Sequence, residues 1–244
     1  VFGSPQRRRR YLDIMLAQFG GRYVHSLQRY QRVVTQRNAV LRAIREGRAI
    51  DSELAYWDES LCSEGAIILG ARYDAMERLA PLVAEAFDRL EATDSLAVTY
   101  AATVPFDQRP TPEVFARALE RVQGAERGAG VTLVGPHRDD LKITMNGVEM
   151  AKHASRGQAR LAALGLRVAE ARLMEERRGD PPVVLLDDVL SELDGRRRTL
   201  VLEEASRNHQ TIITTADLDQ VPRTFLENAH RLRVDAGIVE YETT

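Results

Sequence analysis

Apolar residues recur every three or four positions in the first third of the chain, which is the spacing of one helix face. The first such stripe runs from Leu12 to Phe19 and is broken by Gly20-Gly21. A second helix is predicted from about Tyr23 to Glu46, and a third, capped by Asp51-Ser52, continues to Leu90 with a kink or break at Pro81. Two long amphipathic helices joined by a short loop bury their stripes best as an antiparallel pair, so we expect a helical arm.

The pattern changes to alternation in the middle of the chain. Leu96 to Val104 is predicted to be a strand, and Thr111-Pro112 begins a helix because threonine can cap and proline suits the first turn. Val131 to Val134 and Leu141 to Met145 are also predicted to be strands. Asn146-Gly147 predicts a hairpin after the last of them.

The final part of the chain alternates strands with helices. A helix is predicted from about Gln158 to Glu176, a second near Arg196 to Ser206, and a hairpin turns at Ala236-Gly237. Val183 to Leu186 and Gln210 to Thr215 are predicted to be strands, the first apolar enough to be buried on both faces. Strand, helix and strand in this order indicate an α/β fold with a parallel sheet. We therefore predict a mostly α-helical arm domain over residues 1–130, with a short strand near 96–104, and an α/β domain over residues 131–244.

Two acids follow the buried strand, and two interpretations are open. Asp187 and Asp188 lie at its C-terminal end, where open α/β sheets place their ligands. A magnesium-nucleotide would supply the positive charge that buried acids need. Alternatively, the segment is an ordinary core strand that enters an acidic turn.

The composition is that of a globular protein, with a marked charge asymmetry. Residues 1–48 hold eleven arginines and two acids, whereas the whole chain of 244 residues has a net charge of −2. This asymmetry indicates an anionic partner for the N-terminal part, although solvated helix faces could also account for it. Cys62 is the only cysteine, which excludes an internal disulfide and a cysteine-rich zinc site and suits a reducing, cytoplasmic compartment. No apolar run approaches the ~20 residues of a membrane span.

Several motifs together resemble a known family. Ser155-Arg156-Gly157-Gln158 is similar to the signature motif of ABC-type ATPases, Val183 to Asp188 to their Walker B strand, and Ser191 to Asp194 to their D-loop. Gly3 to Asp13, Gln28 to Leu41 and Gly135 to Leu141 further resemble the RecF family of bacterial DNA-gap repair proteins, which is related to SMC-type ATPases. The resemblance covers essentially the whole chain.

The resemblance implies the C-terminal half of an ABC-type P-loop ATPase head, in which two heads of a homodimer enclose ATP and Mg²⁺. Asp187 would help to hold the metal, and Asp188 would be the catalytic carboxylate that orients or deprotonates water. Nucleotide contacts would come from the following residues: Ser155, Arg156, Gly157, Gln158 and Asp194.

The resemblance also implies a role in replication and recombinational repair, including gap repair and the SOS response. Partners would be duplex DNA, single-strand/duplex junctions, single-stranded DNA and other recombination mediators, with no membrane. The candidate phosphate contacts are arginines of the N-terminal part: Arg7, Arg8, Arg9, Arg10 and Arg37.

The sequence departs from the general ABC pattern in three places. Ala154 and Arg156 replace the usual leucine and first glycine of the signature, and Thr214 to Asp217 lacks the switch histidine. No G-x-x-x-x-G-K-[ST] phosphate loop occurs anywhere in the chain. We therefore expect that loop to precede Val1 in a longer protein, or to be supplied by another chain. We therefore expect the complete protein to be a weak ABC-type ATPase, and this chain alone to be inactive because it lacks the phosphate loop.

Two other functions are compatible with the sequence. The chain could be a non-enzymatic module whose arm docks partners and whose head only dimerises. It could also be the nucleotide-binding subunit of an ABC transporter, although the basic helical arm and the unusual signature argue against that. The turn around His137, Arg138 and Asp139 is expected to be structural, with an internal Arg–Asp pair.

Overall fold

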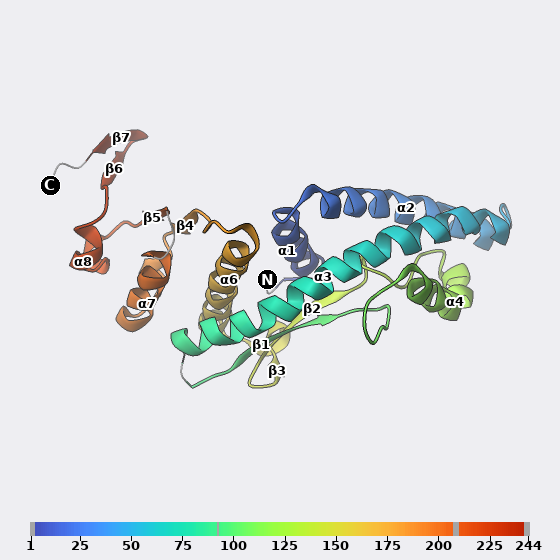
Figure 1. The fold of residues 1–244 in the computed structure, drawn as a ribbon, viewed down its shortest axis with the longest axis horizontal. Coiled ribbons are helices and arrows are strands. Elements are labelled where there is room, and N and C mark those ends of the chain that lie inside the picture. Colours follow the sequence, from blue (N-terminus) through green and yellow to red (C-terminus); the bar gives the residue numbers. More distant parts are fainter. Residues whose placement is uncertain (1–2, 92, 207–209, 242–244) are drawn as a thin grey trace. The chain divides into compact units, whose positions relative to one another are not determined.

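The computed structural model describes residues 3–91, 93–206 and 210–241 of the chain (Figure 1). The chain forms two compact units, Val1–Leu173 and Met174–Thr244. Helix α6 (Arg156–Arg178) begins in the first unit, and its last residues belong to the second. None of the helices in the described ranges is both long and apolar enough to cross a lipid bilayer.

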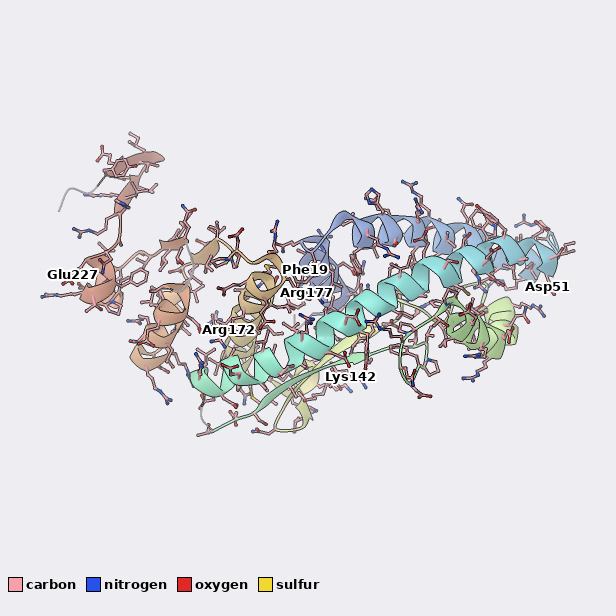
Figure 2. The ribbon with its side chains drawn as sticks, in the orientation of Figure 1. Phe19, Asp51, Lys142, Arg172, Arg177 and Glu227 are labelled. Atoms are coloured by element: carbon pink, nitrogen blue, oxygen red, sulfur yellow. The ribbon has the colours of Figure 1, made fainter. Side chains whose placement is uncertain are left out.

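The first unit is built on a long helical hairpin. Helix α1 (Pro5–Ala17) precedes α2 (Gly21–Arg45), a 3-10 turn η1 (Asp51–Leu54) and α3 (Ala55–Leu90). Helices α2 and α3 lie side by side, and Asp51 marks the end of the arm where the chain turns between them (Figures 1 and 2). The predicted helices and the break after α1 are confirmed. Pro81 lies inside α3 without dividing it.

A small antiparallel sheet supports this hairpin. Strands β1 (Leu96–Ala101), β2 (Asp140–Met145) and β3 (Val148–Glu149) lie in that order, with α4 (Pro112–Ala129) between β1 and β2 in sequence. The short helix α5 (Met150–His153) follows β3. Helix α3 packs against β1, and the core of this unit is mostly apolar. Its fully buried side chains include Leu61, Leu69, Leu79, Phe87 and Phe115.

The predicted strand over residues 131–134 is not formed. Its backbone donors are taken by side chains of neighbouring helices. The Thr132 N–H donates to Asn38 Oδ1 of α2 at 2.7 Å, and the Leu133 N–H donates to Glu126 Oε1 of α4 at 2.8 Å. These backbone N–H groups, which a strand would donate to a neighbouring strand, are therefore hydrogen-bonded although no strand forms here.

The predicted domain boundary at residue 130 falls inside the first unit. Strands β1 and β2 lie on either side of that position and pair with each other from Leu96↔Met145 to Ala101↔Asp140. The two sides therefore share one sheet. The division into an arm of residues 1–130 and a head of residues 131–244 stays a prediction.

The second unit contains the predicted parallel pair. Strands β4 (Val184–Asp187) and β5 (Thr211–Thr214) are joined through η2 (Leu190–Glu192) and α7 (Gly195–Ser206). After β5 come η3 (Leu218–Gln220), α8 (Arg223–Leu226) and the hairpin β6–β7 (Leu232–Asp235 and Ile238–Tyr241). Leu190, Leu202 and Val221 form the core of this unit.

The prediction that the β4 segment is buried on both faces is wrong in this structure. Leu185 is 69% exposed and Ile212 of the paired strand is 49% exposed. The sheet has only two described strands, and Ile213 on one face packs against the core of the unit. Side chains alternate across a strand, so the opposite face of the pair is exposed.

Buried ion pairs connect the arm to the rest of the first unit. Arg37 is 1% exposed, and its guanidinium donates to Glu126 at 2.7 Å and to Asp58 at 2.6 Å. Burial lowers the pKa of Arg37, but its hydrogen bonds to Glu126 and Asp58 outweigh burial and raise that pKa. Arg72 is equally buried and donates to Asp13 at 2.7 Å and to the Pro136 carbonyl at 2.8 Å.

Removing the fully buried partner of Arg37 tests how much this pairing matters. We expect Glu126→Gln to lower the free energy of unfolding by about 3 kcal/mol, because it leaves a buried guanidinium short of one countercharge. The exposed Glu120→Gln on the same helix should change it by less than about 0.5 kcal/mol. Chemical denaturation of both variants measures the difference. Equal stabilities for the two variants would contradict a structural role for the buried pair.

Candidate functional site

The arginine run at the start of α1 divides into two pairs. Arg7 and Arg10 are exposed, whereas Arg8 is 6% exposed and grips both carboxylate oxygens of Asp140 at 2.8 and 2.6 Å. Arg9 is half-buried and donates from Nη1 to the Asp139 carbonyl at 2.7 Å. Two arginines of the run are therefore exposed to solvent, and the other two bind α1 to the start of β2.

Two of the predicted DNA contacts, Arg8 and Arg37, are buried and paired with acids, which argues against a phosphate contact at either residue. Arg37 is enclosed by Glu126, Asp58 and the Thr132 hydroxyl, so no phosphate can reach it. Arg8 is committed to a bidentate pair with Asp140, which is the strongest geometry open to a guanidinium. Arg7 and Arg10 stay candidate contacts, and Arg9 has only part of its guanidinium free.

A basic surface extends along α2. No acid occurs between Asp13 and Glu46, and exposed polar residues repeat at intervals of three or four. We call these residues the outer stripe: Arg22, His25, Arg29, Arg32 and Gln36. They lie on one side of a helix of 25 residues, which is ~37 Å long. Within the stripe, Arg29 is paired with Glu64 of α3 at 3.2 Å and is still 70% exposed at its side chain.

The loop from Gly135 to Asp140 lies beneath α2 and is fixed almost residue by residue. Gly135 has a φ of 118°, and a Cβ there would collide with the Tyr30 hydroxyl. The fully buried Asp139 accepts hydrogen bonds from the Thr103 N–H and hydroxyl, each at 2.7 Å, and from the Tyr100 hydroxyl. The loop is thus held by α2, by β1 and by the segment after β1.

His137 belongs to this structural network. Its Nδ1 is 2.8 Å from the Tyr30 hydroxyl, and its Nε2 is 3.2 Å from the Thr132 carbonyl. This arrangement suits a neutral imidazole that accepts at Nδ1 and donates from Nε2. Burial lowers the pKa of His137 to about 4, which keeps the ring neutral near pH 7.

The turn expected around these residues is present, but its pairing differs. Arg138 does not pair with Asp139: its Nε donates to the Thr132 carbonyl at 3.1 Å, and its side chain is otherwise exposed. Asp139 instead uses its carboxylate to hold the residues after β1. Sequence reasoning assigned no ligand contact to Arg138, because exposure cannot be read from a motif alone.

The signature residues lie at the N-terminus of α6 and are all exposed. The Ser155 hydroxyl accepts from the Gln158 N–H at 3.2 Å, and Gln158 Oε1 accepts from the Ser155 N–H at 3.0 Å. This reciprocal pair is a capping box, so Ser155 is a helix cap as well as a candidate ligand. Its hydroxyl proton is still free to donate. Arg156 and Gly157 expose the first turn, where backbone N–H groups and the helix dipole favour an anion.

The two acids of the Walker B-like segment lie together at the end of β4. Asp187 is opposite Thr214 in the parallel register, and the Thr214 hydroxyl donates to Asp187 Oδ1 at 2.7 Å. The Asp188 N–H donates to the same threonine, at 3.1 Å from its Oγ1 and 3.2 Å from its carbonyl. The sequence analysis did not predict a role for Thr214. The predicted parallel pairing could have indicated it, because the C-terminal ends of β4 and β5 lie side by side.

Asp188 has a left-handed backbone conformation, with a φ of 50°. Aspartate and asparagine tolerate this region better than most residues. Asp194 caps α7 by accepting from the Arg197 N–H at 2.9 Å, and it is exposed. Thus Asp187, Asp188 and Asp194 present carboxylates to solvent within one unit.

The carboxylates at the end of β4 could supply part of a magnesium site, with the other ligands coming from phosphate and water oxygens. No group of three or more His, Cys, Asp or Glu side chains converges for a metal within the described ranges. Mg²⁺ typically needs only one or two carboxylates besides phosphate and water oxygens. Asp187 Oδ1 is held by Thr214, which leaves Oδ2 to coordinate.

The chain is similar to curated proteins over nearly its whole length, although no family model matches it. It is 45% identical over 243 residues to the DNA replication and repair protein RecF of Herpetosiphon aurantiacus, covering 98% of the chain and 62% of that protein. The identity to the RecF protein of Roseiflexus castenholzii is also 45%, over 97% of the chain and 63% of that protein. The chain thus spans less than two thirds of the length of these relatives.

Solved structures agree with the sequence comparison. The recombination mediator protein RecF of the RecFOR pathway, solved with ATPrS, superposes with a TM-score of 0.83 at 29% identity, over 99% of this chain and 64% of that one. The same protein solved with ATP gives a TM-score of 0.82. The ABC-type ATPase fold predicted from the motifs is confirmed by this likeness.

The low pKa of His137 predicts a pH dependence. The folded pKa of about 4 lies below the ordinary value of 6.5, so the unfolded chain binds more protons between these limits. The free energy of unfolding should therefore fall by up to about 3 kcal/mol as the pH drops from 6.5 to 4.

The variant His137→Gln should flatten this dependence above about pH 5, where carboxylates do not yet titrate. The exposed His25→Gln on α2 is the matched control and should keep the wild-type slope. Denaturant unfolding at several pH values measures both. An unchanged slope in His137→Gln would contradict the neutral buried imidazole.

Proposed function

This chain belongs to the RecF family of DNA replication and repair proteins, and on that premise we propose that it acts within an ATP-dependent DNA-binding protein. Its roles would be replication and recombinational repair in the cytoplasm, including gap repair and the SOS response. Other recombination mediators would be its protein partners. The observation that carries the proposal is the outer stripe of α2, which is basic, exposed and free of acids.

The outer stripe suits the phosphate backbone of DNA. Arginines spaced along a straight helix can neutralise successive phosphates and release counterions, which makes binding strongly salt-dependent. Such contacts position a protein on DNA without reading sequence. Arg7 and Arg10 of α1 add two exposed charges before the stripe begins.

The stripe favours duplex DNA over unpaired bases. Single strands are typically held by exposed aromatic side chains on which bases stack. The aromatic residues of α2 are Tyr23 and Tyr30, and both are buried. We therefore assign the duplex side of a single-strand/duplex junction to this surface.

We propose that ATP is held between two copies of the complete head. The exposed turn at Ser155 and Gly157 would donate hydrogen bonds to the terminal phosphate held by the other copy, with Arg156 and Gln158 beside it. RecF has been solved with ATP and with ATPrS, which supports nucleotide binding by the complete protein. Asp194 would lie in the D-loop at the same interface.

The acids of β4 would act on the opposite side of the nucleotide. Asp187, oriented by Thr214, would hold Mg²⁺ together with water and phosphate oxygens. The metal would neutralise phosphate charge during hydrolysis. Asp188 would orient the attacking water and accept its proton, as expected of a carboxylate at this position. Aspartate is one methylene shorter than glutamate, which suits a weak ATPase.

The stripe predicts a specific loss of DNA affinity. The double variant R22Q/R32Q should weaken binding to a labelled duplex about 10- to 30-fold at low salt, because two phosphate contacts are lost. It should also reduce the slope of log affinity against log salt by about two. Fluorescence anisotropy at several salt concentrations measures both quantities.

The matched control is R117Q/R121Q, which removes two exposed charges from α4. It should lower affinity by less than about twofold, since its charges lie outside the stripe. If both double variants weaken binding equally, only overall charge matters, and the stripe is not the interface.

A second prediction concerns hydrolysis in a protein that joins this chain to a phosphate-binding loop. Asp188→Asn keeps a residue suited to positive φ, so folding and ATP-driven dimerisation should persist. Turnover should fall by about 100-fold or more, because the amide cannot accept the proton of water. The exposed Asp180→Asn serves as control in a phosphate-release assay. Undiminished hydrolysis by Asp188→Asn would refute the catalytic role.

A further inference from the structure

We infer that Arg138 is a preorganised contact for a DNA phosphate, presented by the loop Gly135–Asp140. The inference rests on the proposed function and adds to it a residue outside α1 and α2. It follows from how this loop is held, from which of its charges remain exposed, and from what surrounds them.

The loop is a rigid support for one exposed side chain. The carbonyl of Pro136 accepts from Arg72, His137 is bonded to Tyr30, and the carbonyl of Asp139 accepts from Arg9. The carboxylates of both aspartates are bound as well, as described above. Arg138 is the exposed charged residue of this described loop.

The guanidinium of Arg138 is itself partly fixed. Its Nε donates to the Thr132 carbonyl at 3.1 Å, and its backbone N–H donates to the Gly135 carbonyl at 2.8 Å. The first bond restrains the side chain and leaves the Nη1 and Nη2 donors available, and the second holds the backbone of the loop. Restraining a long side chain before binding lowers the entropy lost on binding, and the planar fork matches two phosphate oxygens.

The charges around the loop favour an anion. Asp140 is paired with Arg8 and Glu126 with Arg37, and the buried Asp139 carboxylate accepts hydrogen bonds from Thr103 and Tyr100. Arg9 reaches the same loop through the Asp139 carbonyl. The side chain of Arg42 lies beside Gly130, in the segment that leads to the loop. The charge that the loop exposes to solvent is therefore positive, because Asp139 is buried and Arg138 is exposed.

We assign this site to a phosphodiester of duplex DNA and test it with a fluorescein-labelled duplex and the full chain. R138Q should weaken binding about three- to tenfold at low salt and reduce the salt slope by about one. R138K keeps the charge but lacks the fork, so it should keep the slope and recover part of the affinity. R121Q on α4 should match wild type.

The outcomes separate this inference from the proposed function. If R138Q binds as wild type does while R22Q/R32Q is weakened, the inference is wrong and the outer stripe stands. If R138Q lowers thermal stability without altering the salt slope, Arg138 only braces its loop. If R138Q instead impairs binding of labelled ATP and spares the duplex, the phosphate belongs to the nucleotide. Failure of the wild-type chain to bind the duplex would overturn both proposals.

Discussion

Pairing of buried arginines with carboxylates from distant parts of the chain holds the first unit together. Arg8 reaches Asp140 across 132 positions, and Arg37 reaches Glu126 across 89. Each pair joins a helix of the arginine-rich N-terminal part to an element that follows α3. Breaking such a pair leaves an uncompensated buried charge, which is far more costly than losing a surface pair. The arrangement of α1, α2, α4 and β2 depends on these contacts.

The same pairing determines which arginines are exposed and so available for the proposed contact with DNA. The sequence of an arginine-rich segment does not show which of its arginines are exposed. Arg8 and Arg37 are not at the surface, because they are buried and paired with acids. The exposed candidates are the stripe of α2, Arg7 and Arg10 of α1, and Arg138 on the loop Gly135–Asp140. Because the buried acids are paired with buried arginines, the exposed arginines give this surface a positive potential. The arginines that stabilise the fold are therefore different residues from those proposed to contact DNA.

Local signals in the sequence predicted most of the elements, whereas long-range partners could not be predicted. The break at Gly20-Gly21 and the hairpin at Asn146-Gly147 follow from turn chemistry that acts within a few residues. The fate of residues 131–134 depended on side chains of α2 and α4 that took their backbone donors. The burial of Arg37 and the bridging role of Thr214 likewise arise only after folding. The candidate residues of the nucleotide site could be identified from motifs, because the residues of each motif are adjacent in the sequence.

Chemical modification of arginines with phenylglyoxal, followed site by site with mass spectrometry, tests the central claim most directly. Arg8, Arg37 and Arg72 should resist the reagent with or without duplex DNA, because their guanidinium groups are buried and paired. The exposed arginines of the stripe, and Arg138, should react in the free chain and be protected by the duplex, whereas Arg121 should react in both states. Ready modification of Arg37 in the folded chain, or equal protection of Arg121 and the stripe, would contradict the account.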